Sequence, residues 1–327
     1  MQPKLPLPPA ELLEYIRRGD DFLIIGHKEP DGDCAGSQLA LASALRRMGK
    51  RAESCSSGPF KKSEIVKYQD LFLSTPNENR NFSVILVDCG SLGRTGDIAL
   101  KLKEFPLAII DHHESDKEPP PGTPVYQVPE SPSTTLLIYK LFSALGLTAT
   151  LEEAELLLFG LCTDTGFFRH VDHSGSETFA IAAELIGLGA NPQKIYRDIH
   201  GGKNLLSRVF MGRILASAEA YYDGALIIAS EEYADHQRFG LENRDSDAVY
   251  QQFQSISEVK AIVLIRQETR SSCSVGLRSR DSIDVAEIAK SFGGGGHKNA
   301  SGISNINGVI EEVKPMIIDA FKKEFSR

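Results

Sequence analysis

Asp111, His112 and His113 form the tripeptide in this sequence with the clearest chemical meaning. They end the segment LAIIDHHES at 107–115, in which an apolar run typical of a buried strand leads into one carboxylate and two imidazoles. Such side chains are costly to remove from water unless they pair with one another or bind a metal ion. The rest of the chain must therefore supply their partners.

Two other apolar runs end in similar residues. FLIIG leads into GHKEPDGDCAGS, which carries His27, Asp31 and Asp33 on a Pro/Gly turn, and SVILVDCG contains Asp88. A histidine and two aspartates at this spacing can converge on a cation, although P-D-G-D is also ordinary turn chemistry. Asp88 alone is equally typical of a helix cap. Asp164, in CTDTG, adds a further carboxylate.

Together these segments offer two imidazoles and four carboxylates as metal ligands. The set is His27, Asp31, Asp33, Asp88, His112 and Asp164. It exceeds what one structural zinc ion needs, and imidazole with carboxylate but no thiolate suits Mn²⁺, with Mg²⁺ and Fe²⁺ as alternatives. Two cations that share a carboxylate, about 3.5 to 4 Å apart, would suit phosphoester hydrolysis by an acidified water.

Alternating strands and helices must position these residues. The first half reads as βαβ units: FLIIG, CAGSQLALASALRRMG, SVILVDCG, PLAIIDHH and STTLLIYKLFSALG. This rhythm predicts an α/β fold with a parallel, Rossmann-like sheet. In such sheets, ligands bind beyond the carboxyl ends of the strands, where His27, Asp88 and Asp111 are expected.

The pattern restarts after residue 224 and predicts a second, smaller α/β domain. Strands are expected near 259–266 and 273–278, with a helix from Asp284 and a last helix near 309–325. We expect a catalytic metal-binding domain over 1–200, a connecting helix over 201–223 and a substrate-binding domain over 224–327. The active site is expected in the cleft between the two domains.

Composition limits the setting. The formal net charge of -8 argues against a protein that coats long nucleic acids through a broad basic surface. The N-terminal segment lacks the pattern of a secretory signal, and no apolar run reaches membrane-spanning length. Five cysteines without a CxxC pair are typical of reduced, packed thiols. We therefore expect a cytoplasmic protein that does not associate with membranes.

The second half contains candidate substrate contacts. GLRSR at 276–280 places Arg278 and Ser279 at a strand end, where an arginine fork can bind a terminal phosphate; an exposed basic pair is the structural alternative. The glycine run at 293–296 would be a flexible linker in many proteins, but here it follows an amphipathic helix and leads into His297. The backbone amides of Gly294, Gly295 and Gly296 could therefore approach a phosphate or base. Phe168 in GFFRH could stack on a base or pack in the core.

The motifs, taken in order, resemble those of the DHH phosphoesterases. HKEPDGDCAGS, VDCG, DHH and TDTG resemble the four motifs of the N-terminal domain, and GLRSR and FGGGGHKNASG resemble those of the DHH-associated domain. The resemblance implies one metal ion held by His27, Asp31 and Asp88, and a second held by Asp33, Asp88, His112 and Asp164. It implies that His113 contacts the scissile phosphate, that Asp111 orients the histidines, and that Arg278, Ser279, His297 and Arg94 contact substrate.

Within this family the sequence is most similar to the NrnA-type branch. The resemblance implies degradation of short oligoribonucleotides to nucleoside 5′-monophosphates, dephosphorylation of 3′-phosphoadenosine 5′-phosphate (PAP), and a homodimer. Phosphodiesterases of cyclic or linear dinucleotides share this architecture and stay an alternative, as does a non-catalytic nucleotide sensor. RecJ-type exonucleases fit less well because they are longer and carry an added oligonucleotide-binding domain, and manganese pyrophosphatases because their C-terminal half differs. Asp116 stands where an asparagine is common in the family, which leaves substrate preference open.

Overall fold

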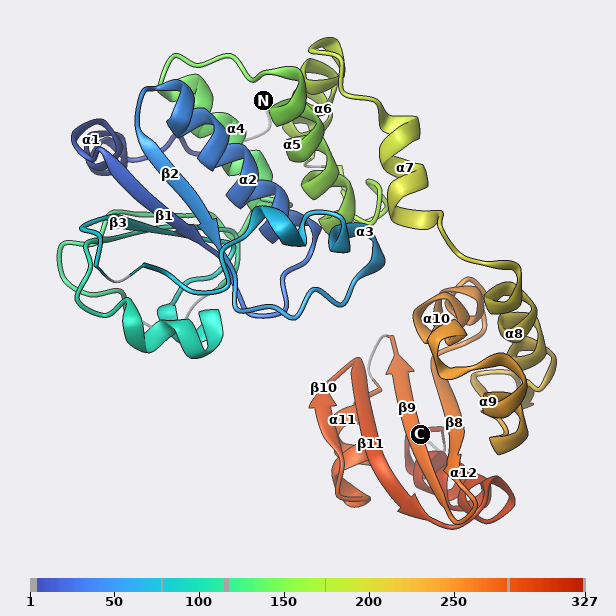
Figure 1. Ribbon diagram of the computed structural model, residues 1–327. Coiled ribbons are helices and arrows are strands. Elements are labelled where there is room, and N and C mark those ends of the chain that lie inside the picture. Colours follow the sequence, from blue (N-terminus) through green and yellow to red (C-terminus); the bar gives the residue numbers. More distant parts are fainter. Residues whose placement is uncertain (1–4, 78, 115–117, 174, 281–282, 326–327) are drawn as a thin grey trace. The chain divides into compact units, whose positions relative to one another are not determined.

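The chain divides into two compact units (Figure 1). Unit 1 comprises Met1–Gly202 and unit 2 comprises Lys203–Arg327. The computed structural model describes residues 5–77, 79–114, 118–173, 175–280 and 283–325. Unit 1 has a parallel sheet and unit 2 a mixed sheet, each with helices, which confirms the predicted α/β class. In these described ranges, no helix is both long and apolar enough to span a membrane.

Unit 1 is built on a sheet whose described strands lie in the order β2-β1-β3-β4-β5, with every pair parallel. The strands are β1 (Asp21–Ile25), β2 (Arg51–Cys55), β3 (Ser83–Val87), β4 (Leu107–Asp111) and β5 (Val125–Gln127). The helices are α1 (Ala10–Arg18), α2 (Gly32–Arg47), α3 (Ser63–Val66), α4 (Thr134–Ala144), α5 (Leu151–Asp164), α6 (Ser176–Gly187) and α7 (Pro192–His200), with 3₁₀ segments η1 (Gln69–Leu71) and η2 (Leu92–Lys101).

The three central strands are the apolar runs seen in the sequence. All but the first residue of β1, β3 and β4 are buried, because helices cover both faces of the sheet. One core contains residues of α2, α4 and α5, which lie over one face in Figure 1. A smaller core on the other face includes Ile98 and Leu102, from η2 and its end. The sheet edge that receives the site residues is therefore rigidly supported.

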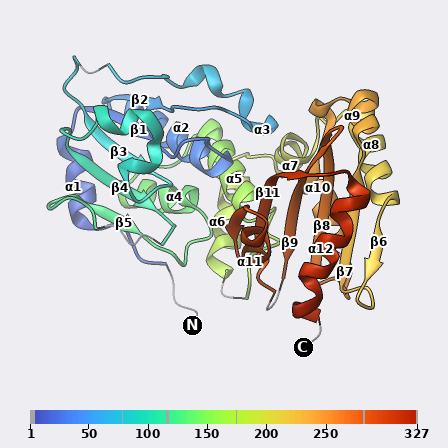
Figure 2. The ribbon, with the colours of Figure 1, turned by 90° about the horizontal axis from the view of Figure 1, so that it is seen from below.

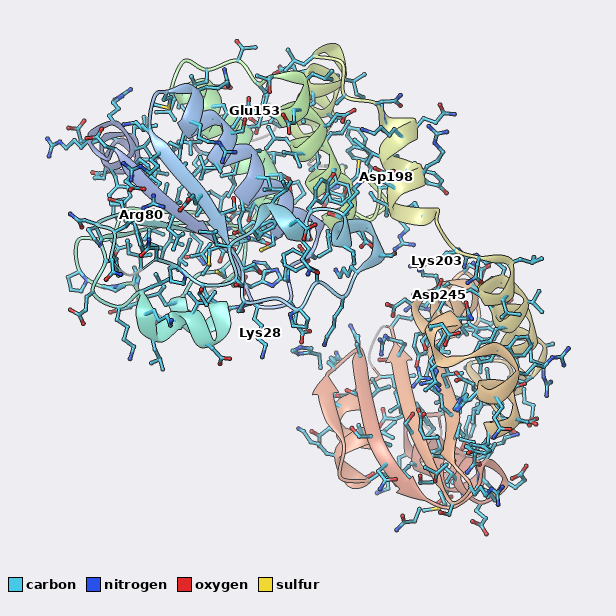
Figure 3. The ribbon with its side chains drawn as sticks, in the orientation of Figure 1. Lys28, Arg80, Glu153, Asp198, Lys203 and Asp245 are labelled. Carbon is cyan, nitrogen blue, oxygen red and sulfur yellow. The ribbon has the colours of Figure 1, made fainter. Side chains whose placement is uncertain are left out.

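Helices α2 and α5 are joined by a buried ion pair. Glu153, labelled in Figure 3, is fully buried and accepts hydrogen bonds from Arg47 at 2.8 and 3.0 Å and from Ser43 at 2.8 Å. Its carboxylate also accepts from the backbone N–H of Thr150, which closes a capping box at the start of α5. A Cβ at Gly160 would lie 3.1 Å from the Cα of Asp33, so α2 and α5 pack closely.

Unit 2 has a mixed sheet in the order β10-β11-β9-β8-β7-β6, as far as the described residues show. Only β7 and β8 pair in parallel. The strands are β6 (Glu219–Tyr221), β7 (Leu226–Glu231), β8 (Ala261–Thr269), β9 (Ser272–Ser279), β10 (Gly295–His297) and β11 (Ala300–Asn307). The helices are α8 (Leu205–Ala216), α9 (Tyr233–Phe239), α10 (Ser246–Gln254), α11 (Val285–Ser291) and α12 (Ile310–Phe325), with η3 (Leu241–Asn243).

Helices pack on both faces of the unit 2 sheet. One core joins the sheet to α11 and α12, and α12 is seen against the strands in Figure 2. The core on the other face joins β7 and β8 to α8, α9 and α10. This second face also carries a pocket between α10 and strands β8, β9, β11 and β10.

The segment between residues 201 and 223 is shorter as a helix than the sequence predicts. Helix α8 ends at Ala216, and Ser217 caps it while its hydroxyl also donates to the carbonyl of Ser230 on β7. Glu219–Tyr221 then forms β6, which pairs antiparallel with β7. The turn back into β7 uses Tyr222 and Asp223 at positive φ. From Lys203 onward, this segment belongs to unit 2.

Candidate active site

The loops after β1, β3 and β4 bring the six predicted metal ligands together at one edge of the unit 1 sheet. His27 follows β1, Asp88 directly follows β3, and His112 directly follows β4. Because these strands are parallel, their carboxyl ends lie at the same edge. Helix α2 begins there with Asp31 as its N-cap, and α5 ends there at Asp164. The structure thus brings together the residues that the sequence singled out, and their role as metal ligands stays a prediction.

Asp88 lies at the centre of the cluster. Its carboxylate oxygens are 3.4 Å from Nε2 of His27, 3.5 Å from Nε2 of His112 and 3.7 Å from Nδ1 of His113. The side chain is 2% exposed and accepts a hydrogen bond from the hydroxyl of Thr134 at 3.1 Å. Its backbone has a φ of 59°, a strained conformation that is typical of functional sites. This geometry aims one carboxylate at three imidazoles.

Asp33 lies in the first turn of α2 and is fully buried. Its side chain faces the N-terminus of α4. Its carboxylate accepts from the backbone N–H groups of Thr134 and Thr135, at 2.6 and 2.9 Å, and from the Thr135 hydroxyl at 2.7 Å. Burial raises the pKa of Asp33 well above its ordinary value, and the nearby charges of Asp88 and Asp164 raise it further. A bound cation would relieve this repulsion between carboxylates.

His112 gives the most direct sign that the cluster fits a cation. Its Nδ1 lies 3.1 Å from the carbonyl oxygen of Ser131, so Nδ1 carries the proton and Nε2 presents its lone pair. That buried Nε2 has no hydrogen-bond partner, yet it lies 3.2 Å from Oδ2 of Asp164 and 3.9 Å from Oδ2 of Asp33. Burial also raises the pKa of Asp164 to about 6. An unpaired nitrogen acceptor that faces two carboxylates fits a positive ion shared by all three groups.

His27 and Asp31 complete the other side of the cluster. Nδ1 of His27 lies 2.8 Å from the carbonyl of Lys28, which turns Nε2 toward Asp88 and toward Asp31, 3.9 Å away. Asp31 also caps α2 by accepting from the N–H of Cys34 at 3.1 Å. The thiol of Cys34 falls within 4.8 Å of ligand atoms of His27 and Asp88. However, burial raises its pKa to about 11, so it stays a neutral thiol.

Asp111 and His113 form a pair beside this cluster. Asp111 is fully buried at the end of β4 and accepts from the backbone N–H of His113 at 3.1 Å. Its Oδ1 also lies 2.9 Å from Nδ1 of His113. This hydrogen bond raises the pKa of His113 and leaves Nε2 on the far side of the ring. The His113 side chain is 37% exposed, so Nε2 is available to a substrate.

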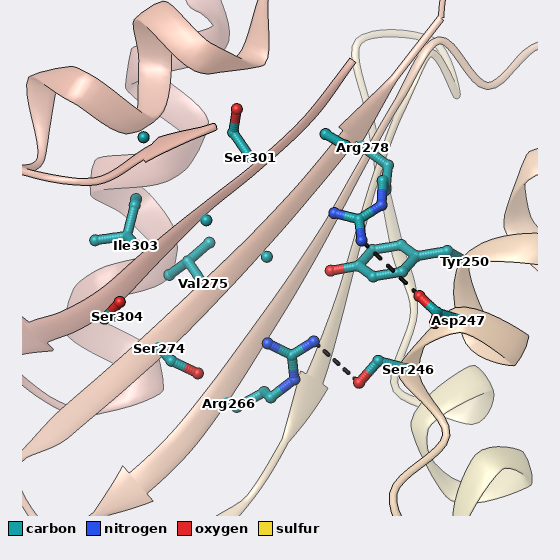
Figure 4. A pocket seen from close by; sticks show the side chains of 14 residues that line it. Ser246, Asp247, Tyr250, Arg266, Ser274, Val275, Arg278, Ser301, Ile303 and Ser304 are labelled. Atoms are coloured by element: carbon teal, nitrogen blue, oxygen red, sulfur yellow. Dashed lines mark hydrogen bonds and ion pairs between the residues drawn. The ribbon is translucent and has the colours of Figure 1, made fainter. Parts of the chain in front are cut away.

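A separate pocket of about 560 Å³ lies on unit 2 between α10 and strands β8, β9, β11 and β10. Two sequence-predicted residues, Arg278 and Gly295, line it. The close-up in Figure 4 shows Arg278 above the ring of Tyr250, with its guanidinium carbon 4.5 Å from the ring centroid. Arg266, which the sequence did not single out, projects into the pocket from β8. The pocket is of a size that holds small ligands in other proteins.

Two family models match the chain in tandem and account for most of its length. The DHH family N-terminal domain matches residues 21–161, and the DHHA1 domain matches residues 225–327. The chain belongs to the DHH family. It is accordingly a hydrolase that acts on phosphoester bonds.

Curated DHH relatives extend along both units. The bifunctional oligoribonuclease and PAP phosphatase NrnA of Thermus thermophilus is 27% identical over 97% of this chain and 94% of the relative. The cyclic-di-AMP phosphodiesterase PdeA of Listeria monocytogenes is also 27% identical over 94% of the chain, but the match spans only 48% of that protein.

Solved structures confirm the DHH fold. An exopolyphosphatase-related protein from Bacteroides fragilis superposes with a TM-score of 0.77 at 24% identity, covering 97% of this chain and 96% of that one. RecJ from Thermus thermophilus, solved with Mn²⁺, gives a TM-score of 0.53 at 18% identity and covers the whole chain but 56% of RecJ.

Three other predicted residues make contacts that fix local structure. The hydroxyl of Ser279 donates to the carbonyl of Ile283 at 2.9 Å, so it holds the chain after β9. The ring of Phe168 stacks on Phe179 with centroids 5.2 Å apart. Arg94 is exposed, and its carbonyl accepts from the backbone N–H of Lys28 at 2.7 Å. Their predicted substrate contacts stay predictions.

The glycine run is part of the unit 2 sheet and not a linker. Gly295–His297 forms β10, which pairs with β11. A Cβ at Gly294 would lie 2.4 Å from the carbonyl oxygen of Gly302, and one at Gly296 would lie 2.6 Å from that of Ala300. These two glycines are therefore needed for close strand pairing. His297 is exposed, two residues from Gly295 and thus on the same face. Asp116 lies outside the described residues.

Some residues of the site had no signal in the sequence. Thr134 and Thr135 hold Asp33 and Asp88, and only their place at the start of a predicted helix hinted at this role. Tyr250 and Arg266 lie in segments with no recognisable motif. Strand register brings Arg266 beside β9, and the packing of α10 brings Tyr250 to the same place.

Proposed function

We propose that this hydrolase degrades short oligoribonucleotides to nucleoside 5′-monophosphates with two divalent cations, and that it also dephosphorylates PAP. The observation that carries the proposal is the convergence of six ligands around Asp88 in a chain whose similarity to NrnA extends over almost the full length of both proteins. The ligands belong to unit 1 alone, whereas the similarity to NrnA extends over both units.

The donor set suits a pair of cations that share Asp88. The first ion would be held by His27, Asp31 and Asp88, and the second by Asp33, Asp88, His112 and Asp164. The assignment is supported in part by three groups of mutually close ligand atoms: His27, Cys34 and Asp88; Asp88, His112 and His113; and Asp33, His112 and Asp164. Oxygen and imidazole ligands favour Mn²⁺, with Mg²⁺ as the alternative. When bound, the two ions would lower the pKa of water and neutralise charge on the phosphate.

His113 would stabilise the reacting phosphate. Asp111 accepts from Nδ1 and raises the pKa of His113, which favours a protonated ring whose Nε2–H can donate to a phosphate oxygen. Such a donor stabilises the charge that develops as the phosphoester bond breaks. Because Asp111 is held by β4, the ring orientation is set before substrate binds.

Unit 2 would select the substrate. Its pocket presents Arg278 and Arg266 with serine hydroxyls, a donor-rich lining suited to a phosphorylated nucleotide. The overall charge of -8 favours local recognition of a short anion over coating of a long strand. We therefore assign metal-dependent chemistry to unit 1 and substrate recognition to unit 2. Free, buried cysteines and nucleotide substrates fit a cytoplasmic enzyme. We also propose that the enzyme is a homodimer.

Hydrolysis of cyclic di-AMP is the second candidate. It is supported by the similarity to PdeA, although that match covers only half of the relative. A nucleotide sensor is the third alternative, but it would not need an intact set of six ligands. The NrnA-like activity is preferred because the NrnA match spans both units and nearly the whole relative.

One assay separates these functions. The purified chain with Mn²⁺ is given the 5′-phosphorylated dinucleotide pApA, PAP, cyclic di-AMP and pyrophosphate in parallel, and AMP or phosphate release is measured. We expect fast release of AMP from pApA and PAP, and slow turnover of the other two. A strong preference for cyclic di-AMP would favour the second function. Binding of nucleotides without any turnover would favour the sensor.

A further inference from the structure

Three glycines from neighbouring strands form one row across the floor of the unit 2 pocket. Gly276 on β9 pairs with Gly302 on β11, which pairs with Gly295 on β10. Residues paired in this way project to the same face of the sheet. A Cβ at Gly295 would meet no other atom within 4 Å, and one at Gly302 would meet only the Val275 carbonyl at 3.6 Å. The row therefore leaves room for a ligand close to the backbone.

Tyr250 and Arg266 meet at the Gly276 end of this row. A Cβ at Gly276 would lie 2.1 Å from the Tyr250 hydroxyl and 3.3 Å from Nη2 of Arg266. Tyr250 is 3% exposed, and its hydroxyl has no hydrogen-bond partner among the described residues although it faces the pocket in Figure 4. Burial raises the pKa of Tyr250, so at neutral pH the hydroxyl is a donor. An unpaired buried donor of this kind calls for an acceptor.

Arg266 makes one loose ion pair inside the protein and no hydrogen bond to a carboxylate among the described residues. Its Nη2 donates to the hydroxyl of Ser246 at 3.0 Å, which orients the guanidinium. Its Nε has no hydrogen-bond partner and lies 3.8 Å from the fully buried carboxylate of Glu231. The other oxygen of that carboxylate, Oε1, is paired with Arg244 at 2.5 Å and His236 at 2.7 Å, whereas Oε2, which faces Arg266, has no hydrogen-bond partner. The ion pair with Glu231 involves Nε, and Nη2 lies at Gly276 in the pocket, where it can meet an external anion.

Arg278 lies on the other side of Tyr250. Its guanidinium packs on the ring face, and its nearest acidic group, Asp247, is 3.9 Å away on a side chain that is 86% exposed. Figure 4 shows the Tyr250 ring between the two guanidinium groups. The pocket thus presents two cationic positions separated by one aromatic ring.

We propose that Arg266 and Tyr250 form a second phosphate position, which binds a phosphate of the substrate that is not hydrolysed. The inference rests on the proposed function. PAP and pApA share one feature: a 5′-phosphate on the nucleoside whose 3′-oxygen is the leaving group. A position with an arginine fork, a tyrosine hydroxyl and a floor without side chains matches the tetrahedral phosphate of that group. Arg266 and Tyr250 would therefore select substrates with a 5′-phosphate.

Two dinucleotides that differ by one phosphate test this position. Turnover of pApA and of ApA, which lacks the 5′-phosphate, is measured for the wild type and for Arg266→Gln, Arg266→Lys and Tyr250→Phe. We expect Arg266→Gln to raise KM for pApA by about tenfold or more, with kcat within about twofold and ApA unaffected. Arg266→Lys should recover part of the loss, and Tyr250→Phe, which keeps the ring packing, should show a smaller increase.

Arg270→Gln is the matched control, because Arg270 is exposed in the turn between β8 and β9. It should leave both substrates unchanged. Equal losses on pApA and ApA, or unchanged KM values in Arg266→Gln and Tyr250→Phe, would overturn the phosphate position.

A binding measurement separates this inference from the proposed function. Calorimetry of the full chain with PAP and with adenosine, without added metal, should show PAP binding weakened about tenfold or more by Arg266→Gln and adenosine binding unchanged. Suppose that Arg266→Gln weakens PAP binding as expected but the wild type hydrolyses no dinucleotide. The proposed function then fails and the phosphate position stands. If dinucleotides are hydrolysed and Arg266→Gln binds PAP as tightly as the wild type, the phosphate position fails and the function stands.

Discussion

At the scale of single residues, the site depends on what each polar atom faces. Nε2 of His112 is buried without a partner, and the carboxylates of Asp33, Asp88 and Asp164 lie close to it. Asp111 differs because its Oδ1 faces His113, although its Oδ2 is also buried without a hydrogen-bond partner. Groups that face the space between His112 and the three carboxylates are suited to bind ions. Groups that face another side chain are suited to orient that side chain. Metal binding and catalysis should therefore respond differently to the two kinds of substitution.

Asp111→Asn separates these two roles. The amide keeps the shape of the side chain but removes the negative charge that orients the His113 ring and favours its protonated form. We therefore expect activity on pApA to fall by about 10- to 100-fold. Manganese content, measured by elemental analysis after gel filtration, should stay near that of the wild type. Asp97→Asn, an exposed aspartate of η2, is the control. Full activity in Asp111→Asn would show that His113 does not depend on this hydrogen bond.

At the scale of elements, the ligands are positioned by helix ends and strand ends. Asp31 and Asp33 are carried by the start of α2, and Asp164 by the end of α5. These two helices are locked by the Glu153–Arg47 pair and by close packing at Gly160. The distance between the ligands therefore depends on a contact made away from the site.

Glu153→Gln tests this lock. Loss of the Glu153 charge should lower the free energy of unfolding by about 2 to 3 kcal/mol. This is less than the loss expected for a fully buried ion pair, because Arg47 is partly exposed to solvent. Urea denaturation followed by circular dichroism measures the change. Glu152→Gln, one residue earlier and exposed, should change stability by less than about 0.5 kcal/mol. An equal effect of both substitutions would argue against the lock.

The sequence predicted those elements whose patterns are local. The apolar runs of β1, β3 and β4 are buried on both faces and were recognisable, as was the polar group that follows each run. Strand β2, RAESC, is mostly polar and has no apolar run, and β6 follows a helix without a break in composition, so neither was predicted. Both depend on pairing with a neighbouring strand, which no local pattern records.

At the scale of the whole molecule, chemistry and recognition lie in different units of one chain. The ligand cluster of unit 1 could be predicted because each member stands in a recognisable motif. The Arg266 and Tyr250 position of unit 2 could not, because Arg266 lies opposite Ser274 on β9 and Tyr250 reaches Gly276 from α10. Such a site exists only once register and helix packing are fixed.

The central claim is that two cations share Asp88. Anomalous diffraction from crystals grown in Mn²⁺ tests it most directly, with the Asp88→Ala variant as the comparison. The account predicts two manganese peaks in the wild type, on opposite sides of the Asp88 carboxylate and about 3.5 to 4 Å apart, and weak or absent peaks in the variant. A wild-type map without manganese between these ligands, or a variant that keeps both ions, would contradict it.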